Sequence, residues 1–410
     1  YTKAAAVEMK TRISERLSAW AVMNEADLAQ SLNDLLGDEI KNETDMNAFK
    51  QMARTRFAAL LDTPGGIKIQ TIHSFCQDIL QRFPLEAEIL PNFDIMEDRE
   101  VDEVLHHLQN KMQLEAELNA DSPLGCSLQY LNAHLDEKSF PQVMKNIAEK
   151  RHEIASLLCR FSNLNEFADA LQRRLQIKEQ KTVEDLMEEY MQAVDRTAVQ
   201  RFLPLWQSGK KVCDVKNSAL MTQMLNRKFP VTDFEKYTKI FTAQNIAGVD
   251  LRRADSQFAD WLENEKQRTM TWLQKIMRQK LYDATLNLMV TATEFINRYE
   301  DYKLRNGKMD YADLILTTKH LLQKSQMADW VLFKLDGGID HILIDEAQDT
   351  SPTQWEIIEA LSAEFLAGEG IKKNATIFAV GDRKQSIFSF QGADPDKYDA
   401  MAAATAEGGS

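Results

Sequence analysis

The sequence predicts an α/β protein in which a parallel sheet is interrupted by a large all-helical insertion. Short β-rich runs occur only toward the two ends of the chain, at 67–71, 341–344 and 375–380. Residues 96–305 instead repeat a helical pattern, with Leu, Met and Trp spaced among Glu, Lys and Gln. Strands that alternate with helices favour a parallel sheet. We therefore expect three segments, at 1–95, 96–305 and 306–410.

Composition predicts a folded, soluble chain. The 410 residues exceed one ordinary domain, and 44% hydrophobic with 27% charged residues is typical of globular proteins. The sequence has no apolar run long enough to span a membrane, and it begins without a signal-peptide pattern. The four cysteines form no C-x-x-C pair, which argues against a zinc cluster or disulfide framework. A reducing cytoplasm fits best, with no membrane partner.

Charge limits the way in which the protein could bind nucleic acid. The formal net charge of −14 argues against wholesale wrapping of DNA, because phosphate neutralisation needs clustered Lys and Arg. Any DNA contact is therefore expected to be local. One candidate is the chain start, where Thr2 and Lys3 precede a helix whose apolar face holds Met9, Leu17 and Trp20. The hydroxyl, the ammonium and the free amides there could contact a phosphate, or form only a solvated helix cap.

A long amphipathic helix is predicted near the end of the insertion. Apolar residues recur every seven positions from Leu281, and no proline lies between Pro230 and Pro352.

Two carboxylates follow the second β-rich run. Asp345 and Glu346 come directly after Ile344, at the end of a strand where ligands bind in open α/β sheets. This is the Walker B arrangement, in which Asp345 would hold Mg²⁺ through its water shell and Glu346 would orient the water that attacks a γ-phosphate. The alternative is a strand end followed by a solvated acidic turn.

The residues after this pair favour the metal site. Ser351 and Gln354 form a capping-box pattern around Pro352, so a helix is predicted to begin there. A right-handed crossover from that helix would bring Asp382, which follows the third β-rich run, beside the first two carboxylates. Like charges so placed are unfavourable without a cation, which suggests a metal–nucleotide site.

Five stretches in order resemble one family. D-E-A-Q-D-T-S-P-x-Q-W at 345–355 and G-D-x-K-Q-S-I-F-x-F-Q-G-A-D at 381–394 resemble motifs II and III of UvrD/Rep-like superfamily 1 helicases, and in particular the AddA component of AddAB helicase-nucleases. The stretch at 2–9 looks like motif Ia, 71–76 looks like the T-x-H-S-F motif, and 309–314 looks like a short motif upstream of motif II.

The resemblance implies a RecA-like motor domain and a set of roles. Asp345, Glu346, Asp382 and Gln385 would bind Mg²⁺-ATP, with Gln385 sensing the γ-phosphate. Phe388 and Phe390 would stack on bases of single-stranded DNA, although both could instead pack in the core. His73 could bond a phosphate or a base edge, but a lone histidine is more often a satisfied turn residue.

One family motif is missing from the sequence. No G-x-x-x-x-G-K-[ST] P-loop occurs, and Gln391 stands where many relatives carry Arg. The resemblance thus implies part of an ATP-dependent 3′-to-5′ DNA helicase of double-strand-break repair, truncated, inactive alone and working with an AddB-like nuclease partner. A second hypothesis is a degenerate helicase-like scaffold or DNA-binding module without hydrolysis. An RNA helicase fits poorly, because D-E-A-D and S-A-T are absent.

Overall fold

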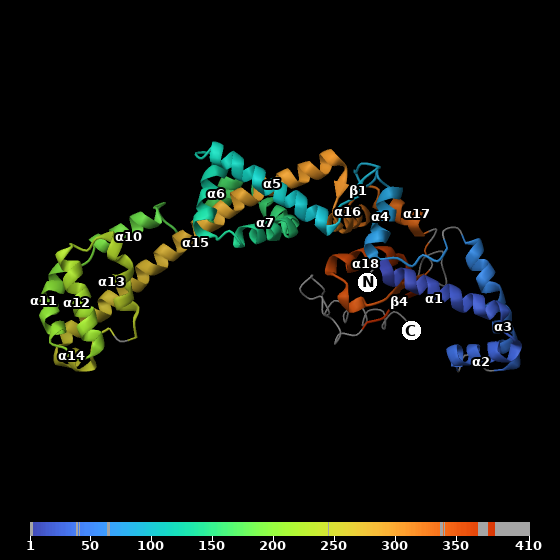
Figure 1. Cartoon of the computed structure of the whole chain (residues 1–410), viewed down its shortest axis with the longest axis horizontal. Helices are drawn as coiled ribbons and strands as arrows, with labels where there is room; N and C mark the ends of the chain where they lie inside the picture. Colours follow the sequence, from blue (N-terminus) through green and yellow to red (C-terminus); the bar gives the residue numbers. More distant parts are fainter. Residues whose placement is uncertain are drawn as a thin grey trace. The chain divides into compact units, whose positions relative to one another are not determined.

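The computed structural model describes residues 3–37, 40, 42–63, 66–244, 246–336, 339, 341–367 and 376–381. Over these residues the protein is mostly helical, with few strands (Figure 1). The chain divides into two compact units, unit 1 with residues 1–101 and 303–410, and unit 2 with residues 102–302. None of the described helices is long and apolar enough to cross a membrane.

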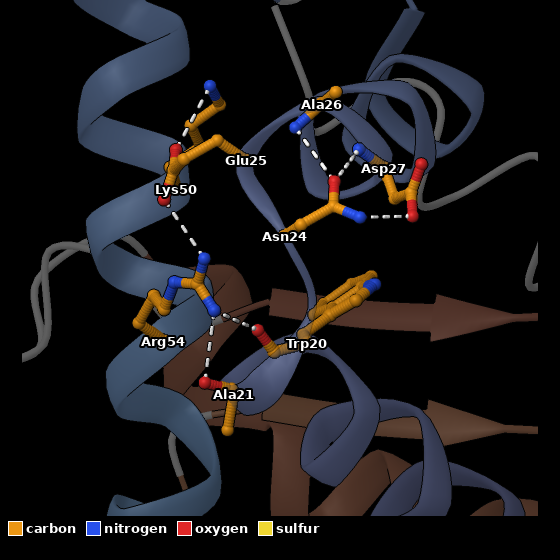
Figure 2. Close-up of polar contacts among 8 residues, drawn as sticks. All are labelled: Trp20, Ala21, Asn24, Glu25, Ala26, Asp27, Lys50 and Arg54. Atoms are coloured by element: carbon orange, nitrogen blue, oxygen red, sulfur yellow. Dashed lines mark hydrogen bonds and ion pairs between the residues drawn. The ribbon is translucent and has the colours of Figure 1, made fainter.

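Unit 1 begins with three helices that share a small core of their own. They are α1 (Lys3–Val22), α2 (Glu25–Leu36) and α3 (Glu43–Asp62). The core consists of Trp20, Leu28, Leu32 and Ala53. Because the Asn24 side chain accepts hydrogen bonds from two backbone amides of the first turn, α2 starts directly after α1 ends (Figure 2).

Arg54 of α3 holds the junction between α1 and α2. Its Nη1 donates to the carbonyl oxygens of Trp20 at 3.3 Å and Ala21 at 3.0 Å, which are in the last turn of α1 (Figure 2). Its Nη2 donates to Glu25 at 2.9 Å, and Lys50 pairs with the same carboxylate at 3.2 Å. The hydrogen bonds from Arg54 and then Lys50 lower the pKa of Glu25. A single guanidinium therefore satisfies carbonyls that the end of α1 leaves without helical partners.

The rest of unit 1 carries four short strands. In chain order its elements are α4 (Ile72–Arg82), β1 (Asp94–Ile95), the start of α5 (Asp98–Leu118), β2 (Lys308–Met309), α16 (Tyr311–Gln323), α17 (Ala328–Asp336), β3 (His341–Ile344), the 3-10 helix η3 (Ala347–Asp349), α18 (Pro352–Ala367) and β4 (Thr376–Ala379). Helices α4, α16, α17 and α18 surround one core that includes Leu80, Leu314, Val331 and Ile357.

The strands form two parallel pairs. In one, β3 aligns with β4 so that Ile342 lies opposite Ile377 and Ile344 opposite Ala379. In the other, β1 aligns with β2, and Asp94 lies opposite Lys308. The predicted strands at 341–344 and near 375–380 are therefore confirmed, whereas the β1–β2 pair was not predicted.

The strand predicted at 67–71 is wrong. Residues 66–71 form no regular strand, and Ile69 donates its amide locally to the carbonyl of Ile67 at 3.0 Å. A β-rich composition shows that a segment suits a pleated surface, but a strand also needs a neighbour whose amides and carbonyls it can pair with.

Unit 2 is built from helices that pack on one long helix. Its elements are the remainder of α5, α6 (Pro123–His134), α7 (Ser139–Glu149), α8 (Arg151–Leu158), α9 (Leu164–Arg174), α10 (Val183–Gln192), α11 (Arg196–Gln207), α12 (Val212–Asn226), η2 (Val231–Asp233), α13 (Phe234–Thr242), α14 (Val249–Ala254) and most of α15 (Ser256–Asn306). The 51-residue α15 contains the long helix predicted from Leu281, but it begins earlier, at Ser256.

Aromatic side chains fill the core of unit 2 around the first half of α15. Helices α10, α11 and α13 contribute Tyr190, Trp206, Tyr237 and Phe241, which belong to one core with Phe258 of α15. Farther along α15, Arg298 pairs with Glu115 of α5 at 2.7 Å. Both halves of α15 therefore hold other helices of unit 2.

Candidate functional site

The predicted carboxylate pair lies at the carboxyl end of β3. Asp345 and Glu346 are both exposed and directly follow the strand. Next to them, the β4 end is hydrogen-bonded to the same turn, because Val380 donates to the Ile344 carbonyl at 2.8 Å and accepts from the Ala347 amide at 2.9 Å. The turn that carries the two carboxylates is therefore fixed to the end of the neighbouring strand.

Glu346 has an unusual backbone conformation. Its φ of 52° and ψ of 44° lie in the left-handed region, which costs an L-residue roughly 1–2 kcal/mol. Its carboxylate accepts a hydrogen bond from Nε2 of Gln348 at 2.6 Å, and the Gln348 side chain is buried. This turn redirects the chain into η3 and leaves the Glu346 carboxylate exposed beside Asp345.

The helix after the site begins as the sequence predicts. The Ser351 amide donates to the side chain of Gln354 at 3.0 Å, and the Gln354 amide donates to the Ser351 hydroxyl at 3.4 Å. Trp355, one turn into α18, is fully buried in a small core with Ala347 and Ile358. The predicted capping box is confirmed. Ala347, in the turn after β3, packs in the same small core as Trp355 and Ile358 of α18.

Ile72 of the T-I-H-S-F motif packs against the same core, so this motif lies next to the β3 turn. Thr71 caps α4 by accepting from the Ser74 amide at 3.2 Å. His73 is partly buried, and its ring meets Tyr311 edge-on with 5.1 Å between ring centroids. Burial lowers the pKa of His73. His73 thus contacts a residue of the 309–314 motif, and both motifs belong to unit 1.

The 309–314 motif starts α16 and anchors the end of α15. Asp310 and Asp313 form a reciprocal capping box at the start of α16. The Asp313 carboxylate also pairs with Lys303 Nζ at 2.7 Å. Asp313 therefore links the start of α16 to the end of α15.

The donor set at the β3 turn suits a hard cation. Asp345 and Glu346 offer carboxylate oxygens, the ligands that Mg²⁺ prefers. Among the residues that the structure describes, no Lys or Arg forms an ion pair with either carboxylate, and no group of three His, Cys, Asp or Glu side chains makes a ready metal cage. Mg²⁺ bound with few protein ligands and several waters is compatible with both observations.

Several predicted site residues lie outside the described residues. They are Thr2, Asp382, Gln385, Phe388 and Phe390. Lys3 is the first residue of α1, and its side chain is not described. Asp345, Glu346 and His73 are placed. The contacts of Gln348 were not predicted, because the sequence indicates this residue only as part of the family pattern. The one local signal is a side-chain amide two residues after a carboxylate in a short turn.

Comparison with known proteins gives consistent relatives. The A subunit of the ATP-dependent helicase/nuclease of Lactobacillus gasseri is 24% identical over 97% of this chain and 32% of its own length. The protein of the same name from Listeria welshimeri is 24% identical over 96% of this chain and 31% of its own length. A probable DNA helicase II homolog of Mycoplasma genitalium is 29% identical over 42% of this chain and 24% of its own length.

The chain thus spans about a third of the length of the helicase/nuclease relatives. The family model for the UvrD/REP helicase N-terminal domain matches residues 1–405, which include the β3 turn and the T-I-H-S-F motif. The chain therefore belongs to the UvrD/REP helicase family, to which it is matched through the family's N-terminal domain.

Proposed function

We propose that this chain is part of an ATP-dependent DNA helicase that moves 3′ to 5′ on single-stranded DNA during double-strand-break repair. Unit 1 would contribute to a RecA-like motor domain, with unit 2 as its helical insertion. The names of the relatives support a helicase that works beside a nuclease partner, which we propose to be AddB-like. A protein of this kind would act in the cytoplasm on single- and double-stranded DNA.

The observation that carries the proposal is the exposed carboxylate pair at the end of β3, bonded through its turn to the end of β4. Asp345 would hold Mg²⁺ through its water shell. Glu346 would orient and polarise the attacking water. Bound Mg²⁺-ATP would supply the phosphoanhydride whose hydrolysis drives movement. Asp382 and Gln385 follow β4 in sequence, and we propose that they bind the nucleotide as well.

DNA would be gripped by residues of the other motifs. Phe388 and Phe390 are proposed to stack on bases, a contact that tolerates any sequence. Thr2 and Lys3 at the start of α1 are proposed to contact a phosphate. His73 is also proposed to bond a DNA phosphate or a base edge, and it belongs to the motif whose Ile72 packs in the core beside the β3 turn.

The test is DNA-stimulated ATP hydrolysis by the native polypeptide that carries these residues. Glu346→Gln is expected to abolish hydrolysis while ATP binding persists, and Asp345→Asn is expected to raise the Mg²⁺ concentration that hydrolysis needs. Hydrolysis that survives Glu346→Gln would refute the assignment. Since no P-loop occurs among the 410 residues, we expect this chain by itself to bind Mg²⁺-ATP poorly, and robust ATPase activity from it would contradict that expectation.

A further inference from the structure

We infer that Gln348 is a positioning residue that ties the Glu346 carboxylate to the end of β4, so that the orientation of Glu346 depends on the place of Gly381. The inference rests on the proposed function, because it concerns the group that would activate water. It assigns a role to a buried amide that makes no contact with the reacting atoms itself.

The first half of the connection is the hydrogen bond to Glu346. Gln348 Nε2 donates to Glu346 Oε2 at 2.6 Å, and the Gln348 side chain is only 1% exposed. Glu346 itself is exposed and sits in the left-handed region of backbone space. An exposed carboxylate on a flexible side chain would sample several directions in water. The buried amide selects one of them.

The second half is the close approach of Gly381. A methyl group added at Gly381 would lie 2.5 Å from Gln348 Oε1, 3.1 Å from the Gln348 amide nitrogen and 3.3 Å from the Ala347 amide nitrogen. The first of these distances is too short for any real contact. Relief of that clash needs a shift of the Gly381 backbone or a turn of the Gln348 side chain, and the turn would carry Nε2 away from Glu346.

The two halves share one side chain, because the amide that bonds Glu346 also fills the space next to Gly381. The backbone bonds of Val380 to Ile344 and Ala347 already fix the β4 end to the turn. Gln348 adds a connection from this backbone to the functional carboxylate. A shift of the residues that follow β4 would therefore be transmitted to Glu346, and this is the direction in which a nucleotide-dependent signal could pass.

The first experiment compares variants in DNA-stimulated ATP hydrolysis by the native polypeptide. Gln348→Met keeps the side-chain length and removes the donor, and it is expected to lower kcat about 10- to 100-fold with little change in KM for ATP. The matched control is Gln323→Met, which removes an exposed amide that bonds the Glu356 carbonyl at 3.1 Å, away from the turn. An unchanged kcat in Gln348→Met would overturn the inference.

A double-mutant cycle tests whether Gly381 acts through Gln348. Gly381→Ala is expected to lower kcat in the wild-type background and to have a smaller effect in the Gln348→Ala background, because the 2.5 Å clash with Oε1 is gone and only the 3.1 Å and 3.3 Å contacts with the two backbone nitrogens remain. An equal loss in both backgrounds would show that the two residues act separately, and would also overturn the inference.

A measurement without nucleotide separates positioning from misfolding. Hydrogen exchange of the 410-residue chain should show faster exchange of the Ala347 and Val380 amides in Gln348→Met, with protection retained in α16 and α18. Loss of protection throughout unit 1 would instead mean a purely structural role and would overturn the inference. If Glu346→Gln leaves hydrolysis intact, the proposed function fails; if Glu346→Gln abolishes it and Gln348→Met is silent, only the positioning inference fails.

Discussion

Lys303 and Asp313 form a buried ion pair, with 2.7 Å between Nζ and the carboxylate and with 4% and 12% of the two side chains exposed. Lys303 lies in the last turn of α15, and Asp313 lies in the first turn of α16. The pair therefore joins the two helices across the β2 strand that separates them in sequence.

Removal of the lysine should destabilise unit 1. Lys303→Met removes the ammonium that contacts both oxygens of the partly buried Asp313 carboxylate, and we expect a loss of about 3–5 kcal/mol in the free energy of unfolding. Urea unfolding followed by circular dichroism measures it. The double variant Lys303→Met/Asp313→Asn should be more stable than Lys303→Met alone, because the amide carries no charge but still accepts the Asp310 amide. A double variant that is less stable than Lys303→Met would count against this explanation.

Arg54 should contribute more to the stability of unit 1 than its ion pair with Glu25 suggests. Its partner Glu25 has a side chain that is 70% exposed, so that pair contributes little, whereas two bonds reach carbonyls at the end of α1. We expect Arg54→Met to cost about 1–2 kcal/mol, measured by thermal unfolding. The control is Arg12→Met, which removes an exposed pair with Glu8. Equal unfolding temperatures for the two variants would argue against the carbonyl bonds.

His73 should make unit 1 less stable in mild acid. Burial lowers its pKa in the folded state, so the unfolded state binds protons more readily and stability falls as pH drops below the ordinary histidine value of about 6.5. When the pH is lowered from neutral to below that value, the free energy of unfolding should fall less for His73→Gln than for the wild type. Denaturant titrations at each pH measure it. His107→Gln, at an exposed position of α5, controls for the loss of one imidazole side chain. Identical pH profiles for wild type and His73→Gln would show that His73 contributes nothing.

Phe388 tests the proposed DNA grip. Phe388→Ala should weaken binding of single-stranded DNA to the 410-residue chain by about 1–3 kcal/mol, the value of one lost stacking contact, as measured by fluorescence anisotropy. Phe333→Ala is a suitable control, since Phe333 is 65% exposed on α17 and has no proposed role. Unchanged affinity for Phe388→Ala would mean that the ring packs in the core. Mg²⁺-ATP is expected to change the affinity of this chain little.

Local signals in the sequence were the most reliable guide to the fold. The start of α18 follows from Ser351, Pro352 and Gln354, because a capping box involves only neighbouring residues. The long helix α15 and the strands β3 and β4 follow from apolar patterns. The β1–β2 pair could not be predicted, since two residues in each strand carry no periodicity and the pairing joins positions far apart in sequence.

The site was predictable only in part. That Asp345 and Glu346 follow a strand could be read from the apolar run before them, and their chemical roles stay predictions. The left-handed backbone at Glu346 and the close approach of Gly381 to Gln348 depend on how the turn after β3 meets the end of β4. A local residue pattern therefore cannot predict them. Sequence indicates which groups are available, whereas their mutual restraint is a property of the folded turn.

In unit 1, the β1–β2 pair fixes both ends of the chain segment that runs from β1 to β2. Met96 donates to the Met309 carbonyl at 2.8 Å, and Asp94 donates to the Gly307 carbonyl at 2.8 Å, so the chain leaves and returns at one place. The entropy cost of closing a loop grows only with the logarithm of its length. Helices could therefore be gained or lost between β1 and β2 with little change in the free energy of unfolding of unit 1, which carries Asp345 and Glu346.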